Sequence, residues 1–143
     1  MTFEKTYQVR WADVDMNAHM RHSAFNDYAA QLRVDLFSEY GIDINLFHRL
    51  NIGPVIFREE THFFKELYLN EKFSVHGEVA AQSKDYKKWS IRHVFYKTNG
   101  DIAADITVDG AWMDLKKRKV SPPPEEIQQK LKNFPLAKDF KWI

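Results

Sequence analysis

The chain has 143 residues, 44% of them hydrophobic and 15% aromatic, which is typical of one folded domain spanning residues 1–143. Its 21 basic and 20 acidic residues nearly cancel, so no global field favours binding to nucleic acid or to an anionic membrane. The absence of cysteine excludes disulfides, zinc–thiolate sites and thiol nucleophiles.

The N-terminal third predicts a strand followed by one long helix. Residues 3–12 alternate and place Phe3, Tyr7, Val9 and Trp11 on one face of a strand. From about His22 the apolar residues recur with helical spacing and predict a helix over residues 22–40, with this stripe: Phe25, Tyr28, Ala29, Leu32, Leu36 and Tyr40. Gly41 follows, where a helix commonly ends.

The rest of the chain predicts mainly strands. We expect a short helical turn that Gly53 and Pro54 end. Four strands then follow, at residues 55–65, 72–82, 88–97 and 101–115, and Asn99-Gly100 predicts a hairpin between the last two. In the first of these strands, Val55, Phe57, Glu59, Thr61 and Phe63 are expected to share one side. Residues 124–134 predict a short helix after a proline run.

This order of elements indicates the fold class. A strand, a long helix and four consecutive strands favour an α+β fold rather than alternating βαβ units. We expect a five-stranded, largely antiparallel sheet wrapped around one long central helix. No segment has the length of a signal peptide or a membrane span, so a cytoplasmic protein with no membrane span is expected.

The connector VRWADVDMNAHMRHSAF, residues 9–25, concentrates groups that transfer protons: Asp13, Asp15, His19 and His22. The predicted helix start near His22 offers unpaired N–H groups and the positive end of a dipole, which suit a developing oxyanion. A carboxylate and an N–H donor that converge on one carbonyl can hydrolyse an ester or a thioester.

Other interpretations of the connector remain open. An aspartate ahead of a helix also serves as a cap or in an Asx-turn. His19 and His22 with the two aspartates suggest a metal site only weakly, because no HExxH motif or further ligand cluster supports one, and we expect no metal. No GxSxG motif supports a serine triad.

The order Arg10-Trp11-Ala12-Asp13-Val14-Asp15, followed by Ala18-His19-Met20 and Phe25, resembles the hotdog-fold acyl-CoA thioesterases of the 4-hydroxybenzoyl-CoA thioesterase type. The resemblance implies a hotdog fold, with Asp15 as general base or nucleophile and the backbone N–H near His22 as the oxyanion donor. It also implies homodimers that pair two sheets edge to edge, often homotetramers, and an acyl-CoA substrate. No cofactor is implied beyond the CoA of the substrate.

The chain departs from that family pattern within the connector. Ala18 replaces the usual Gly and resists a positive φ. Arg21-His22 replaces an Asn pair, and Phe25 replaces a Tyr. These changes alter the loop hydrogen bonds and the acyl pocket, so the sequence does not fix the acyl group.

Substrate-binding residues are expected in three places. His19 and Phe25 lie next to the predicted catalytic residues, and Phe57 on the following strand is expected to line the acyl pocket. Lys84, Lys87 and Lys88 lie at a predicted strand turn and are candidates for the CoA phosphates, as is the basic run at residues 116–119. The alternative is that both clusters are solvated turn charges.

Three functions follow from these observations. The leading hypothesis is an acyl-CoA thioesterase that releases free acid and CoA. The altered Arg21-His22 pair motivates a second, a non-catalytic module that binds acyl-CoA or acyl-carrier protein. A hotdog dehydratase is less favoured, since that chemistry normally needs a His paired with a carboxylate on the central helix, where this chain has its only His at the start.

Overall fold

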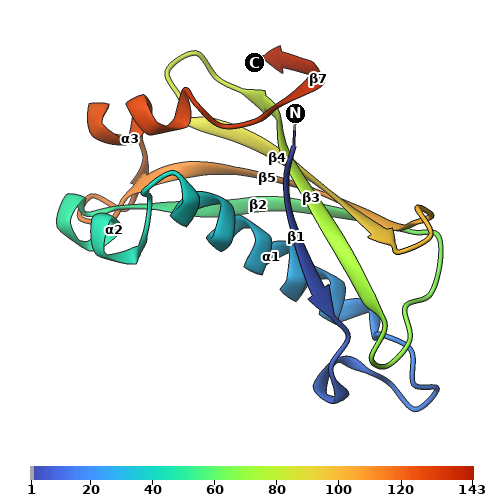
Figure 1. Cartoon of the computed structure of the whole chain (residues 1–143). Helices are drawn as coiled ribbons and strands as arrows, with labels where there is room; N and C mark the ends of the chain where they lie inside the picture. The colour runs from blue at the N-terminus through green and yellow to red at the C-terminus, as the bar shows by residue number, and fades with distance from the viewer. Residues whose placement is uncertain (1) are drawn as a thin grey trace.

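The computed structural model describes residues 2–143 and shows a curved sheet with α1 packed along its concave side (Figure 1). In chain order the elements are β1 (Phe3–Gln8), η1 (Trp11–Asp13), α1 (His22–Glu39), α2 (Ile44–Leu50), β2 (Ile52–Phe63), β3 (Lys72–Gln82), β4 (Lys88–Lys97), β5 (Ile102–Asp114), β6 (Lys119–Val120), α3 (Glu125–Leu131) and β7 (Leu136–Trp142).

The five expected strands form the sheet in the order β1-β3-β4-β5-β2, and each neighbouring pair is antiparallel. The predicted α+β class and the sheet around one long helix are therefore confirmed. Two short strands were not predicted: β6 pairs with β5, and β7 pairs in parallel with β3. β1 covers the first half of β3 and β7 continues along the same edge from Val79.

Helix α1 has the predicted bounds to within one residue, and its apolar stripe is buried in the core except for Tyr40, which follows the helix and is partly buried. The sheet approaches the helix closely at Gly77, where a Cβ atom would lie 2.7 Å from the Leu32 side chain. A residue without a side chain is therefore needed at this point of β3. Gly41 has φ +76°, as expected for the residue that follows a helix end.

The alternation in β3, β4 and β5 is observed as predicted over most of their length. One face of each strand is buried against α1, and Ile102 at the start of β5 is the exception, with 42% exposure. The Asn99-Gly100 hairpin joins β4 to β5, and Gly100 has φ +92°. The alternation predicts these strands because each has one buried face.

Three expectations for the edges of the fold were wrong. β1 ends at Gln8, and Trp11 lies in η1 with 82% of its surface exposed. Gly53 and Pro54 lie inside β2 rather than ending the preceding segment, which is possible because β2 is an edge strand that tolerates proline. A β-bulge between Ile56 and Arg58 breaks the predicted alternation.

The bulge decides which β2 side chains face the helix. Beyond it, Glu59, Thr61 and Phe63 pair with buried β5 residues and share their concave side. Before the bulge, Ile56 pairs with Gly110, and after it Arg58 pairs with Asp109. Phe57 is the extra, unpaired residue between them, so it belongs to the alternating pattern of neither half of β2. Within residues 2–143, no helix is both long enough and apolar enough to cross a membrane.

Candidate functional site

The connector between β1 and α1 folds into a small hairpin. Val14 bridges Met20, the Asp15 N–H donates to the His19 carbonyl at 2.9 Å, and the Ala18 N–H donates to the Asp15 carbonyl at 3.0 Å. Ala18 has φ +59°, in the left-handed region that favours glycine. The replacement of Gly by Ala therefore occurs where the backbone conformation disfavours it.

Asp13, the first aspartate of the connector, is fully buried and anchors this hairpin. Its carboxylate accepts hydrogen bonds from the Arg10 backbone N–H at 2.9 Å, from the Arg10 guanidinium at 2.9 and 3.2 Å, and from the Tyr28 hydroxyl. Burial alone would raise the pKa of Asp13, but the hydrogen bonds from Arg10 and Tyr28 outweigh it and hold that pKa below its usual value. Asp13 is thus ionised, enclosed and structural.

Asp15, the predicted catalytic carboxylate, is exposed. Its Oδ1 accepts the N–H of Asn17 at 2.9 Å and the N–H of His19 at 3.3 Å, so Asp15 braces its own turn. Its Oδ2 accepts no hydrogen bond from residues 2–143. The Asx-turn interpretation is therefore correct for one oxygen, while the other remains free to act on a proton.

Helix α1 begins without a side-chain cap. The residue before it, Arg21, makes no capping hydrogen bond, and its N–H donates to the Asp13 carbonyl at 2.8 Å. In the described part of the chain, the N–H groups of His22 and Ser23 have no acceptor. The positive end of the helix dipole is therefore open next to the connector.

A pocket of about 220 Å³ lies at this helix start and is lined by Met20, His22, Phe25, Phe63, Phe64, Lys65 and Glu66. The Phe25 ring packs edge-on against Phe63 with centroids 5.3 Å apart. His22 and Phe25 thus line the same pocket. Asp15, His19 and Phe57 are not among the residues that line this pocket.

Neither His19 nor Phe57 lines this pocket. His19 lies in the connector, and Phe57 lies on β2, the strand that also carries the lining residue Phe63. The His19 ring packs edge-on against Tyr68 at 4.8 Å, and its Nδ1 lies 3.5 Å from Glu66 Oε1. Phe57 is at the β2 bulge with 61% of its surface exposed. Its predicted role in the acyl pocket has no support within one chain.

The predicted phosphate-binding lysines lie at the other end of the molecule. β3 starts beside the connector, where the Val9 N–H donates to the Glu71 carbonyl, and its 11 residues carry the chain about 35 Å away. Lys84 and Lys87 belong to the turn that follows, between β3 and β4, and Lys88 is the first residue of β4 (Figure 1). Within one chain they are not brought together with Asp15.

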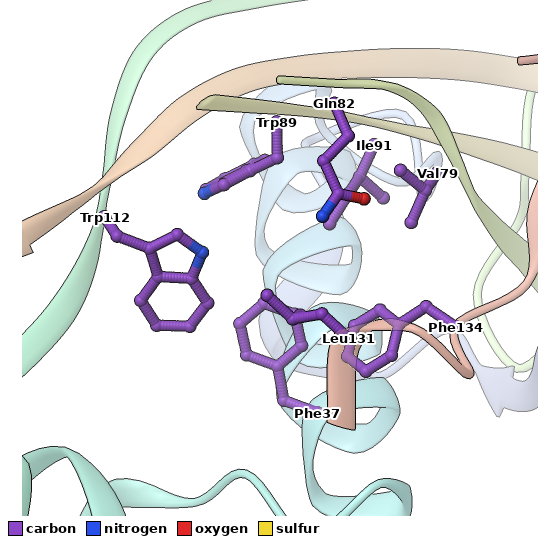
Figure 2. Close-up of a pocket in the computed structure, with 8 residues that line it drawn as sticks. All are labelled: Phe37, Val79, Gln82, Trp89, Ile91, Trp112, Leu131 and Phe134. Carbon is purple, nitrogen blue, oxygen red and sulfur yellow. The ribbon is translucent and has the colours of Figure 1, made fainter. Parts of the chain in front are cut away.

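A separate small cavity lies between α1, α3 and the sheet, lined by the side chains drawn in Figure 2, and it is too small for an acyl group. Its volume is about 20 Å³, which is room for one water molecule. Trp89 is one of its lining residues, and the buried indole N–H of Trp89 has no hydrogen-bond partner in residues 2–143. A buried water would satisfy that donor.

No group of three metal-ligating side chains is found in residues 2–143.

The pocket at the start of α1 is also lined by residues that the sequence analysis did not single out. Phe64, Lys65 and Glu66 follow β2 and close the pocket at the helix start. They come together with His22 because β2 runs antiparallel to the direction of α1 and ends beside its first turn (Figure 1). The strand predicted over residues 55–65 already ended at this point of the chain. Its direction relative to α1 is the signal that could have placed these residues beside His22.

Residues 9–131 match the family model described as the thioesterase-like superfamily. The chain belongs to this superfamily. The match includes the connector, α1 and four of the five main strands, and it excludes β1 and β7. No curated protein matches the chain.

Solved structures of members of this fold superpose closely. The hypothetical protein SAV2348 from Staphylococcus aureus, solved in complex with CoA, has 21% identity and a TM-score of 0.86 over 96% of this chain and 89% of its own. Slr0204, a 1,4-dihydroxy-2-naphthoyl-CoA thioesterase from Synechocystis, has 15% identity and a TM-score of 0.83, over 93% and 97%. A DHNA-CoA thioesterase from Staphylococcus aureus has 14% identity and a TM-score of 0.80, over 92% and 89%. The predicted hotdog fold is confirmed, and the narrower 4-hydroxybenzoyl-CoA type stays a prediction.

Proposed function

We propose that this protein hydrolyses acyl-CoA thioesters at the start of α1, with Asp15 as general base or nucleophile. The observation that carries the proposal is the uncapped first turn of α1 at the end of a connector whose Asp15 carboxylate keeps one free oxygen, in a chain of the thioesterase-like superfamily. The CoA bound to one structural neighbour supports a CoA thioester as the ligand class.

The chemistry follows from these groups. As general base, Asp15 takes a proton from water while the water oxygen adds to the thioester carbonyl carbon. The oxyanion that forms accepts hydrogen bonds from the N–H groups at His22 and Ser23. The C–S bond then breaks, CoA leaves and takes up the proton, and the products are a carboxylic acid and the CoA thiol. As nucleophile, Asp15 would form an anhydride that water opens.

The proposal includes a homodimer formed along β2. β2 is an open edge of the sheet, and it carries exposed Ile56, Phe57 and Phe63. Antiparallel pairing of two copies of β2 would place the start of one strand beside the end of the other. Each pocket at an α1 start would then adjoin the partner's β5–β6 turn, which carries the basic run at residues 116–119.

A thiol-release assay tests the function. The chain has no cysteine, so a thiol reagent reports only the CoA that is released. Wild-type protein is expected to release CoA from at least one member of a panel of short, long and aromatic acyl-CoAs. Asp15→Asn, which keeps the turn hydrogen bonds, is expected to lower turnover about 100-fold or more. Asp139→Asn, an exposed aspartate on β7, should retain wild-type turnover.

A non-catalytic acyl-CoA module is the second candidate, and one observation favours it. Asp15 does not line the pocket at the helix start within one chain. Calorimetric binding of acyl-CoA with no CoA release across the panel would establish the module and contradict the hydrolase. Wild-type turnover by Asp15→Asn would remove Asp15 from the mechanism.

A further inference from the structure

A second and larger hollow lies further along the line where α1 faces β2. This groove has a volume of about 530 Å³, within the range of small-molecule sites. The C-terminal half of α1, α2 and the start of β2 form its walls, and most of its lining is apolar: Val34, Phe37, Ile44, Phe47, Pro54 and Ile56. It shares no lining residue with the pocket at the helix start.

Arg33 is the one basic residue in the lining of this groove. Its Nη1 lies 3.3 Å from Nε2 of His93, and it forms no ion pair with a carboxylate in residues 2–143. Burial lowers the pKa of Arg33, and Glu59 opposes this only through space. The group stays charged, and four of its five N–H donors have no partner among the described residues.

The remaining donors are not sealed off, and Arg33 is a lining residue of the groove. In residues 2–143 the sealed polar atoms without a partner are on Arg21 and Trp89, and none is on Arg33. The other ionisable lining residue, Asp43, is already engaged, because its carboxylate caps α2 by accepting the Leu46 N–H at 2.9 Å. The groove therefore combines an apolar wall with one cation that forms no ion pair in residues 2–143, although the charge of Glu59 acts on it through space.

His93 fixes the position of Arg33. His93 is fully buried on β4, and its Nδ1 donates to the Ile106 carbonyl at 2.9 Å. The Nε2 atom is then the acceptor of the neutral ring and receives the Arg33 hydrogen bond. A guanidinium held on one side by a rigid acceptor is prepared to bind an anion on its other side.

We propose that this groove holds the acyl group of a thioester that carries its own carboxylate at the far end, and that Arg33 binds that carboxylate. The proposal rests on the proposed function. The carboxylate must be a second one, since the acid that hydrolysis creates forms at the α1 start. Arg33 is 11 residues further along the helix, about 16 Å from His22. Along α1 and β2, Asn26 and Thr61 stand between the residues that line the two sites, and an acyl chain that reaches the groove would cross their hydrogen bond.

The test compares two thioesters of equal length, dodecanedioyl-CoA and dodecanoyl-CoA. Wild-type protein should have the higher kcat/KM for dodecanedioyl-CoA. Arg33→Gln should reduce that preference about 10- to 100-fold, because a hydrogen-bonded charge pair is lost. Arg49→Gln changes an arginine outside the groove and should leave the preference unchanged. Circular dichroism and thermal unfolding report whether each variant is folded.

A binding measurement separates this inference from the proposed function. Dodecanoate and dodecanol are titrated into the intact protein by calorimetry, without any thioester present. Binding of dodecanoate but not dodecanol, abolished in Arg33→Gln, supports the groove chemistry even when no acyl-CoA is hydrolysed. Equal binding of both probes, no binding of either, or hydrolysis of both thioesters without preference overturns the inference and leaves the hydrolase standing.

Discussion

The Tyr28 hydroxyl on α1 donates a hydrogen bond to the carboxylate of Asp13, which ties the connector to the helix. The hydroxyl loses its proton less readily as a result: burial and the bond to Asp13 raise the pKa of Tyr28 to about 12. Asp15, two residues after Asp13 in the connector, is exposed to solvent. The two aspartates of the connector therefore have different roles, one structural and one available for chemistry.

The first prediction concerns stability. Asp13→Asn should lower the free energy of unfolding by about 1–3 kcal/mol, because it weakens a buried acceptor that serves Arg10 and Tyr28. Asp15→Asn should change it by less than about 0.5 kcal/mol, as is usual for an exposed side chain. Urea unfolding of both variants measures the difference. Equal losses would mean that the two carboxylates do not differ in their structural role.

The second prediction concerns the backbone of the connector. Ala18 pays a cost of about 1 kcal/mol for its left-handed conformation, which glycine would not pay. Ala18→Gly should therefore raise the free energy of unfolding by up to about 0.5 kcal/mol, after the larger entropy of glycine in the unfolded chain is subtracted. The same substitution in the middle of α1, Ala30→Gly, should lower it by about 1 kcal/mol. A loss of stability in Ala18→Gly would contradict the argument.

The sequence predicted those elements whose signals are local. The stripe of α1 and the alternation of β3 to β5 are periodic because each element has one buried face, and Leu32 and Val75 follow that period closely. Gly41 and Gly100 have positive φ at the positions where a helix end and a hairpin were predicted. Local backbone chemistry was sufficient for these features.

Features that depend on non-local contacts could not be predicted. β7 pairs with β3 only because β1 leaves that part of the edge free beyond Gly77. The bulge after Ile56 adds one residue to β2, and no pattern in the sequence marks it. Asp13 and Asp15 differ in burial because η1 turns the chain between Trp11 and Val14. Spacing alone does not give the direction of either side chain.

The third prediction concerns acid stability. Burial, with a further contribution from the Arg33 charge, lowers the pKa of His93 to about 3. The folded protein therefore keeps His93 neutral, while the unfolded chain takes up a proton below about pH 6.5. Stability is full above that pH and falls as the pH decreases towards 3.

Chemical unfolding at two pH values measures this effect. Between about pH 7.5 and pH 5.5, His93 should account for a loss of about 1.4 kcal/mol, which is the cost of one proton bound only by the unfolded state. His93→Gln lacks this proton, so its loss over the same interval should be smaller by that amount. His76→Gln, at a half-buried position on β3, serves as the control. Parallel pH profiles for wild type and His93→Gln would contradict the assignment.

The fourth prediction concerns assembly along β2. This strand spans Ile52–Phe63, so antiparallel pairing over its whole length would bring the two copies of Phe57 close to the symmetry axis. Phe57→Lys removes an exposed aromatic contact and places two like charges there, and charged residues on an edge strand oppose pairing. Light scattering after size-exclusion chromatography should give a multiple of the chain mass for wild type and a shift towards the single chain for Phe57→Lys.

Trp142→Lys is the control for this experiment. It changes an exposed aromatic residue on β7, outside β2, and should leave the mass unchanged. Dissociation by Trp142→Lys but not by Phe57→Lys would move the interface from β2 to β7, and the pocket at the α1 start would then lie away from the partner's basic turn.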